Sequence, residues 1–134
     1  MAFATRTIRD TVVAAGDVGG TTQHGTVVIH LDHSSDSATS AALDASALSG
    51  HANGAKLSIT RAWWGLAGSV EIQFKGSSTD THAIRFAGTG SYTGPAIKNN
   101  ATNTGATGGD LESVAAGATG FIILELRKDI AFTA

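Results

Sequence analysis

The residues whose types most resemble a metal site are His30, Asp32 and His33 in the segment HLDH. Imidazole and carboxylate groups are both ligands of first-row metal ions. In an extended strand, however, His30 and Asp32 share one face while His33 points to the other. The three side chains can converge only if the strand ends abruptly at Asp32. The spacing therefore favours a solvated strand end over a metal site.

The segment AGTGSYTG, residues 87–94, contains glycines of the kind found in phosphate-binding loops. Such a loop needs a helix N-terminus directly after the glycines, so that backbone N–H groups meet the phosphate. Pro95 and a run of turn residues follow instead. We therefore interpret the segment as a sharp corner between strands.

Oxygen ligands for calcium are present at Asp110 and in the group Asp32, Asp36 and Asp44, but EF-hand spacing is absent. The sequence also has no GxSxG segment, no cysteine nucleophile and no pair of carboxylates whose spacing singles it out. We expect a protein that is not an enzyme and that needs neither a metal ion nor an organic cofactor.

The elements that would position these residues are strands, because apolar and polar residues alternate and turn residues separate the alternating segments. A short helix is an open alternative for residues 37–48, SATSAALDASAL, where Asp36 or Ser37 would cap its start. The predicted strands are TIRDTVV (7–13), TVVIHLDH (26–33), KLSITRAWW (56–64), SVEIQFK (69–75), HAIRFAG (82–88) and FIILELRK (121–128), with DLESV (110–114) as a weaker candidate.

Many short strands without long helices predict an all-β fold, an antiparallel β-sandwich with a jelly roll or closed barrel as alternatives. The length fits one domain over residues 1–134. An extended conformation of the N-terminal segment is an alternative that the sequence leaves open. Period two assigns these residues to the core: Ile8, Val12, Val27, Ile29, Leu31, Leu57, Ile59, Trp63, Val70, Ile72, Phe74, Ile84, Phe86, Ile122, Leu124 and Leu126.

Charge and composition indicate which kinds of binding partner to expect. The formal net charge is -2 and the basic residues are scattered, so neither nucleic acid nor an anionic membrane is an expected partner. We expect a chain without a signal peptide that folds in the cytoplasm, since it has no cysteine and no apolar stretch at its start. Only 15% of the residues are charged, which favours a surface that is covered in an assembly, such as a homo-oligomer.

Interface candidates come from the two adjacent tryptophans and the last strand. If GLAG, residues 65–68, is a four-residue hairpin loop, Trp63 faces the core and Trp64 faces outward. A bulge that turns both rings inward is the alternative. Phe121 and Ile123 alternate with core residues, so the last strand is apolar on both faces. We predict that Trp64, Phe121 and Ile123 contribute to an interface, unless a helix or loop covers the last two.

From Lys56 onward the order of features resembles small structural proteins of tailed bacteriophages. The similar features are a strand ending in AWW, a hairpin into SVEIQF, a strand closing on AGTGSY, then PAIKNN, GATGGDLES and a final strand TGFIILELRK. The similarity covers somewhat more than half of the chain and leaves the first 55 residues unassigned. It carries no catalytic residues with it.

This resemblance implies a β-rich component of the virion, first of all a head decoration or cement protein that binds the major capsid protein and stabilises the shell. A tail or connector part is the other location that it implies. The rival hypothesis is a carbohydrate-binding β-sandwich, alone or on a host-recognition spike, in which an exposed aromatic ring stacks on a sugar.

Overall fold

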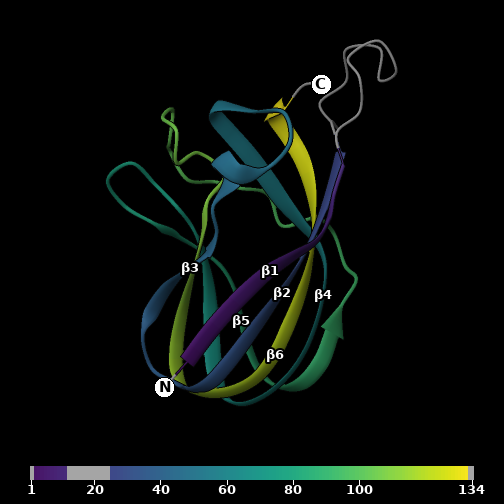
Figure 1. The fold of residues 1–134 in the computed structure, drawn as a ribbon, viewed down its shortest axis with the longest axis vertical. Helices are drawn as coiled ribbons and strands as arrows, with labels where there is room; N and C mark the ends of the chain where they lie inside the picture. Colours follow the sequence, from purple (N-terminus) through teal and green to yellow (C-terminus); the bar gives the residue numbers. More distant parts are fainter. Residues whose placement is uncertain (1, 12–24, 133–134) are drawn as a thin grey trace.

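The chain folds into antiparallel strands that form one curled sheet. The computed structural model describes residues 2–11 and 25–132. The strand order is β1-β2-β6-β4-β5, and β3 pairs with β6 beside this path (Figure 1). The predicted all-β fold is confirmed. The elements are β1 (Ala2–Asp10), β2 (Gly25–Asp36), β3 (Thr39–Leu43), a 3₁₀ helix (Ala45–Ala47), β4 (His51–Phe74), β5 (Thr81–Tyr92) and β6 (Leu111–Phe132).

The long strands β4 and β6 form the centre of the sheet and pair from one end to the other. Residues 111–116 of β6 lie beside β3 and the last part of β4, which in turn pairs with the start of β5; we call this region the β3 end. Residues 118–128 of β6 lie between β2 and the earlier part of β4, with β1 beyond β2, and β6 then continues beside β4 to Phe132; we call this region the β1 end.

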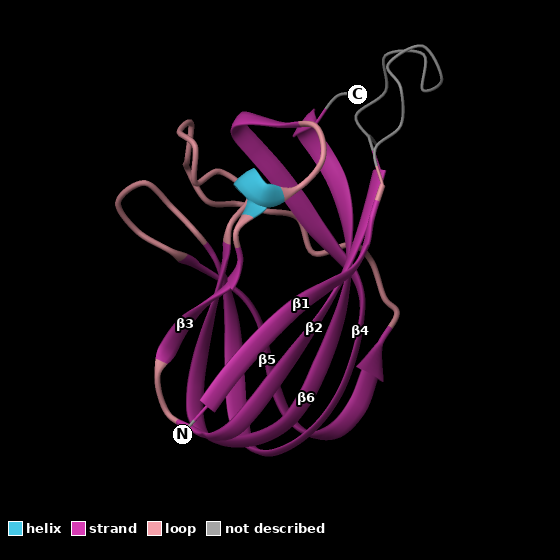
Figure 2. Ribbon diagram, in the orientation of Figure 1, coloured by secondary structure: helices cyan, strands magenta, loops and turns pink. Residues whose placement is uncertain are grey.

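A line of left-handed residues separates the two ends. Ser35 in β2, Gly117 in β6, Gly68 in β4 and Gly88 in β5 have φ angles of 47°, 59°, 77° and 66°. The pairing register shifts at the same level in each of these strands. Bulges bend strands and increase their twist. The sheet therefore turns along this line, which we call the fold line, and Figure 2 shows the strands curling around a shared interior.

One hydrophobic core lies between the two ends, because the inward side chains of both belong to the same cluster. The core contains most of the residues that alternation assigned to it, and Ile84 packs against it from a half-buried position. The predicted core residues that are buried are Val27, Ile29, Leu31, Leu57, Ile59, Val70, Ile72, Phe74, Phe86, Ile122, Leu124 and Leu126.

Two local predictions are wrong, and the α-helix that was left open for residues 37–48 does not form. The segment GLAG is not a hairpin loop, because β4 continues through it and its last glycine, Gly68, belongs to the fold line. Residues 37–48 do not form an α-helix: they form β3 and the 3₁₀ helix, whose first turn is capped by the Asp44 side chain. DLESV and FIILELRK are parts of one strand, β6, and not two strands.

The core prediction fails for Ile8, which is 52% exposed. The register of β1 against β2 shifts between Thr7 and Arg9, so Ile8 lies at a bulge in an edge strand. Val12, the other core residue predicted for this segment, lies outside the described residues.

A buried ion pair fixes the end of β1. The Lys128 side chain is fully buried, and its Nζ lies 2.6 Å from Asp10 Oδ1. Lys128 Nζ also donates to the Ser49 carbonyl and lies 5.2 Å from the centre of the Phe132 ring. Burial alone would raise the pKa of Asp10, but its hydrogen bonds to Lys128 and to the Ser49 backbone outweigh this effect and lower it.

The fold line predicts unequal costs for two glycine substitutions. A Cβ at Gly68 would lie 2.3 Å from the Gly117 carbonyl oxygen, whereas a Cβ at Gly88 would have no heavy atom within 4 Å. Both residues have positive φ, so Gly88→Ala is expected to lower the free energy of unfolding by about 1–2 kcal/mol. Gly68→Ala should cost clearly more, because backbone atoms must also move. Urea denaturation of both variants measures the difference, and equal losses would contradict this account of the fold line.

Candidate functional site

Three large apolar side chains lie on the outward face of the β1 end. Ile123 of β6 is directly opposite Trp63 of β4, and Phe121 is opposite Gly65. Phe121 is 40% exposed, and Trp63 and Ile123 are half-buried. Opposed side chains on adjacent strands are about 5 Å apart and diagonal ones about 7–8 Å, so the three form one continuous patch. We call Trp63, Ile123 and Phe121 the aromatic face.

Glycine and strand parity together create this patch. A Cβ at Gly65 would lie 3.0 Å from a carbon of the Phe121 ring, so the ring lies close over the backbone of β4. The outward placement predicted for Phe121 and Ile123 is confirmed, since Ile122 and Leu124 between and beside them are buried. Their predicted role in an interface stays a prediction.

A bulge decides which tryptophan joins the aromatic face. Ile59 and Arg61 of β4 pair with two consecutive residues of β6, so Thr60 is an extra residue. A bulge of one residue reverses which side chains of a strand face inward. Ile59 is buried before the bulge and Ala62 is buried after it. Trp63 therefore points outward.

The predicted placement of the two tryptophans is consequently wrong. Trp64 packs against the core, with its ring centre 4.6 Å from that of Phe86. Its indole N–H donates to the Ala87 carbonyl at 3.0 Å. A Cβ at Gly90, opposite Trp64 on β5, would lie 2.8 Å from the indole ring. Trp64 is a packing residue, and Trp63 takes the outward position that was expected for Trp64.

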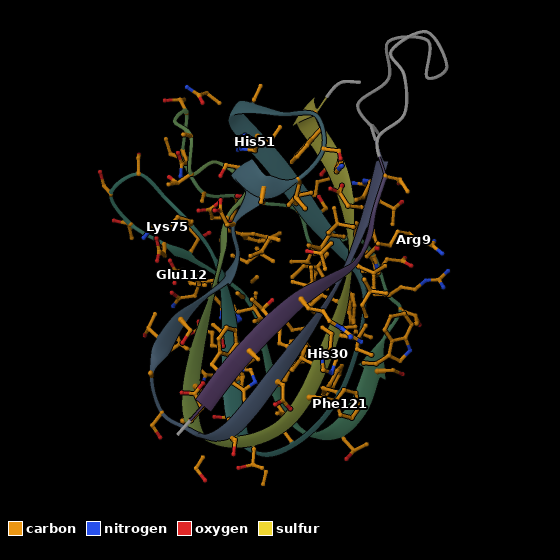
Figure 3. All side chains as sticks on the ribbon, viewed as in Figure 1. Arg9, His30, His51, Lys75, Glu112 and Phe121 are labelled. Atoms are coloured by element: carbon orange, nitrogen blue, oxygen red, sulfur yellow. The ribbon has the colours of Figure 1, made fainter. Side chains whose placement is uncertain are left out.

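Charged and polar side chains border the aromatic face. His30 pairs with Ile123 across β2 and β6, and Arg6 pairs with His30 across β1 and β2. Asp32 lies opposite Phe121. Figure 3 shows His30 and Phe121 on the same side of the molecule, with Arg9 further along it. Among the described residues, neither Arg6 nor Arg9 has a carboxylate within ion-pair distance.

The outward face of the β3 end has a different chemistry. Glu71 Oε2 lies 2.5 Å from His82 Nδ1, and Glu71 Oε1 lies 3.7 Å from Arg85. The hydrogen bond from His82 lowers the pKa of Glu71, against a smaller opposing effect of burial. Lys75 Nζ lies 3.5 Å from Glu112. We call Glu71, His82, Arg85, Lys75 and Glu112 the ionic face. In the view of Figure 3, Lys75 and Glu112 lie on the left side of the molecule and Phe121 lies on the right.

The two faces differ in how far their side chains interact with other groups of the same chain. The charges of the ionic face have partners within the chain, whereas the rings of the aromatic face present apolar surface to solvent. Large apolar side chains grouped on a surface mark sites of interaction. The aromatic face is therefore the candidate functional site.

The HLDH segment divides between the two sides of β2, as alternation predicted. His30 and Asp32 face outward, and His33 is buried. His33 Nε2 lies 3.0 Å from Ser113 Oγ and 3.8 Å from Asp36 Oδ2. Burial lowers the pKa of His33, against smaller opposing effects of Asp36 and Asp32.

The buried group does not have the geometry of a catalytic triad. A triad uses one imidazole nitrogen for the serine and the other for the carboxylate. Here both contacts involve Nε2, while Nδ1 of His33 is buried without a hydrogen-bond partner among the described residues. Ser113 is fully buried, so its hydroxyl cannot reach a substrate. The group is structural and lies where β2 and β6 pass the fold line.

The other candidate segments are also structural. AGTGSYTG continues β5 to Tyr92, and the tyrosine hydroxyl then donates to the Pro95 carbonyl. Asp36, Asp44 and Asp110 each accept hydrogen bonds from backbone N–H groups. Burial raises the pKa of Asp110, with the Ala45 N–H opposing it. Within residues 2–11 and 25–132, no group of three or more acidic or histidine side chains could hold a metal ion.

A polar hollow of about 300 Å³ lies between the loop after β4 and the loop before β6. Thr81 donates to the Asn100 side chain across it, and Ser77 donates to the Thr102 carbonyl. Its lining offers hydroxyl and amide groups but no ring on which a ligand could stack. The lining residues are Ser77, Ser78, Thr79, Thr81, Asn100 and Thr102.

Comparison with protein-family models, curated proteins and solved structures found no match to this chain. In the described part of the chain, no helix has the length and hydropathy needed to cross a lipid bilayer.

Trp64 faces the core and Trp63 faces outward, so the two adjacent substitutions are expected to lower the free energy of unfolding by unequal amounts. Trp64→Ala empties a site against Phe86 and removes the hydrogen bond to Ala87, so we expect a loss of about 3–5 kcal/mol in the free energy of unfolding. Trp63→Ala should change it by less than about 1 kcal/mol, because its ring lies on the outer face. Chemical denaturation followed by circular dichroism measures both, and the reverse order would show that the parity of β4 is misassigned.

The buried histidine predicts a loss of stability in mild acid. The unfolded chain binds a proton at His33 near pH 6.5, whereas the folded chain binds it only at lower pH because burial lowers this pKa. The unfolded state therefore binds more protons between these two pKa values. Stability falls as pH decreases through this window, by at most about 1.4 kcal/mol per pH unit.

Replacement of the histidine tests this dependence. His33→Gln should reduce the change in unfolding free energy between pH 7 and pH 5, because it removes the imidazole whose pKa is lowered by burial. Urea titrations at the two pH values measure it. If His33→Gln keeps the full pH dependence, another group is responsible.

Proposed function

We propose that this protein is a non-enzymatic structural component of a bacteriophage virion, a decoration or cement protein that binds the major capsid protein through its aromatic face. The observation that carries the proposal is the contrast between the two outward faces of the sheet. Trp63, Ile123 and Phe121 are presented to solvent, while the ionic face satisfies its charges internally.

The composition of the aromatic face supports a protein partner. Tryptophan and arginine are enriched at the energetic centres of protein interfaces, and apolar residues there are surrounded by polar ones. Trp63 and Ile123 lie in the same register row as His30 and Arg6. A partner surface that combines apolar side chains with carboxylates would complement this arrangement.

The resemblance of residues 56–128 to phage structural proteins supports the choice of a virion as the assembly. The low charge content of the chain supports it too, because an assembly covers surface that would otherwise be exposed to water. The buried position of Ser113 and His33 supports a role without catalysis.

A carbohydrate ligand is the second candidate, and one observation favours it. Phe121 and Trp63 lie on a sheet surface beside Asp32 and His30, side chains that can bond sugar hydroxyls while the rings stack on the sugar. The polar hollow near Asn100 lacks such a ring, so a glycan would bind at the aromatic face.

Co-sedimentation with particles that lack the protein tests the proposal. Trp63→Ala and Phe121→Ser are each expected to weaken attachment by about 30-fold, the equivalent of about 2 kcal/mol for a central interface residue. Arg85→Ala removes a large exposed side chain from the ionic face and should attach like the unchanged protein.

Three results would decide between the candidates. Loss of attachment in the two aromatic variants alone, with circular dichroism spectra unchanged, supports the virion role. Attachment that is the same in all variants contradicts a role for the aromatic face. Binding to a glycan array that depends on Trp63, without any binding to particles, selects the carbohydrate ligand instead.

A further inference from the structure

The border of the aromatic face on the side of β1 is basic. Arg6 lies opposite His30, and Arg9 lies opposite Val28, both on the outward side of β2. The two arginines are exposed. Figure 3 shows Arg9 at the margin of the molecule, on the same side as His30 and Phe121. We call this border, with its two guanidinium groups, the basic flank.

The arginines of the basic flank differ from their neighbours on the same outward face. Arg61 Nε lies 3.6 Å from Glu125, and Arg127 Nε lies 2.6 Å from Asp129. Within residues 2–11 and 25–132, no carboxylate lies at ion-pair distance from either arginine of β1. A guanidinium group binds a carboxylate through paired, planar hydrogen bonds. The basic flank therefore selects an anionic group on a partner.

The opposite border of the aromatic face, on the side of β5, is uncharged. Ser91 lies opposite Trp63, and Thr89 lies opposite Gly65. Both β5 residues are exposed. In an interface, buried aromatic anchors provide most of the affinity, whereas charges at the rim govern orientation and the rate of association. Charge on one border alone gives the aromatic face a direction.

A protein surface fits this arrangement better than a polyanion does. Asp32 is exposed on the outward side of β2, opposite Phe121, and Glu125 lies on the same face. A chain of phosphates would pass over these carboxylates, and surfaces that bind nucleic acid have a continuous basic patch instead. A folded protein can place its carboxylates at the basic flank and keep them away from Asp32.

We propose that the aromatic face binds a protein surface whose apolar site is bordered by carboxylates on one side only. Arg6 and Arg9 bind these carboxylates and fix the orientation of the protein on its partner. The identity of the partner, the capsid surface, rests on the proposed function, which this inference deepens by assigning the partner's charge and the direction of docking.

The sign of each charge effect tests the inference on particles that lack the protein. The double variant Arg6→Gln/Arg9→Gln should attach about tenfold more weakly at low salt, at about threefold for each exposed charge pair. Asp32→Asn should attach about twofold more tightly, because it removes a charge of the partner's own sign. Lys75→Gln/Arg85→Gln removes the same number of positive charges from the ionic face and should attach like the unchanged protein.

Salt separates the charge effect from the apolar contacts. Attachment is measured by co-sedimentation between about 50 and 500 mM sodium chloride, where screening shortens the reach of exposed charges to about 4 Å. The deficit of the arginine double variant should shrink as salt increases, whereas the deficit of Trp63→Ala should persist. Circular dichroism spectra of all variants should match that of the unchanged protein.

The outcomes distinguish this inference from the proposed function. If the arginine double variant attaches as well as its control while Trp63→Ala attaches weakly, the inference is overturned and the proposed function stands. Asp32→Asn that attaches no more tightly than the unchanged protein also overturns it, and weaker attachment of this variant with binding to a glycan array favours the carbohydrate ligand. Absence of attachment by the unchanged protein contradicts both.

Discussion

The fold depends on one constraint: four strands must bend at the same level. A sheet whose strands bent at different levels would break its ladder of hydrogen bonds, because neighbours must stay in register. Ser35, Gly117, Gly68 and Gly88 all adopt the left-handed conformation that permits this bend. At Gly68 the backbones approach so closely that a side chain would collide with the Gly117 carbonyl. The inward side chains of both ends meet in one core only because this line exists.

The bend also determines what the outside of the sheet can do. Trp64 reaches across the fold line, packing on Phe86 and bonding the Ala87 carbonyl. Its position requires Gly90 opposite and, through the Thr60 bulge, leaves Trp63 on the outer side. The outward tryptophan is thus a consequence of how the core is closed, and the apolar surface that results is the part of the molecule best suited to a partner.

Alternation in the sequence predicted the strands and most of the core, because period two is a local property. The position of a bulge depends on the pairing with a neighbouring strand, which a single segment of sequence does not contain. A glycine in a turn and a glycine in a bulge therefore cannot be distinguished from sequence, and GLAG is predicted as a hairpin loop for this reason. One signal was available, since Arg61 falls on the inward parity of KLSITRAWW and is exposed in the structure. The burial of Lys128 had no such signal, because its partner Asp10 is distant in sequence.

The buried Lys128 gives β1 a register that its own side chains cannot. Thr5 and Thr7 are exposed, so hydrophobic burial does not penalise a shift of this strand along β2. A shift of one residue would turn Asp10 to the other face and leave the Lys128 ammonium buried without a carboxylate, which costs about 3–5 kcal/mol. The ion pair therefore specifies where β1 binds more than it adds to stability.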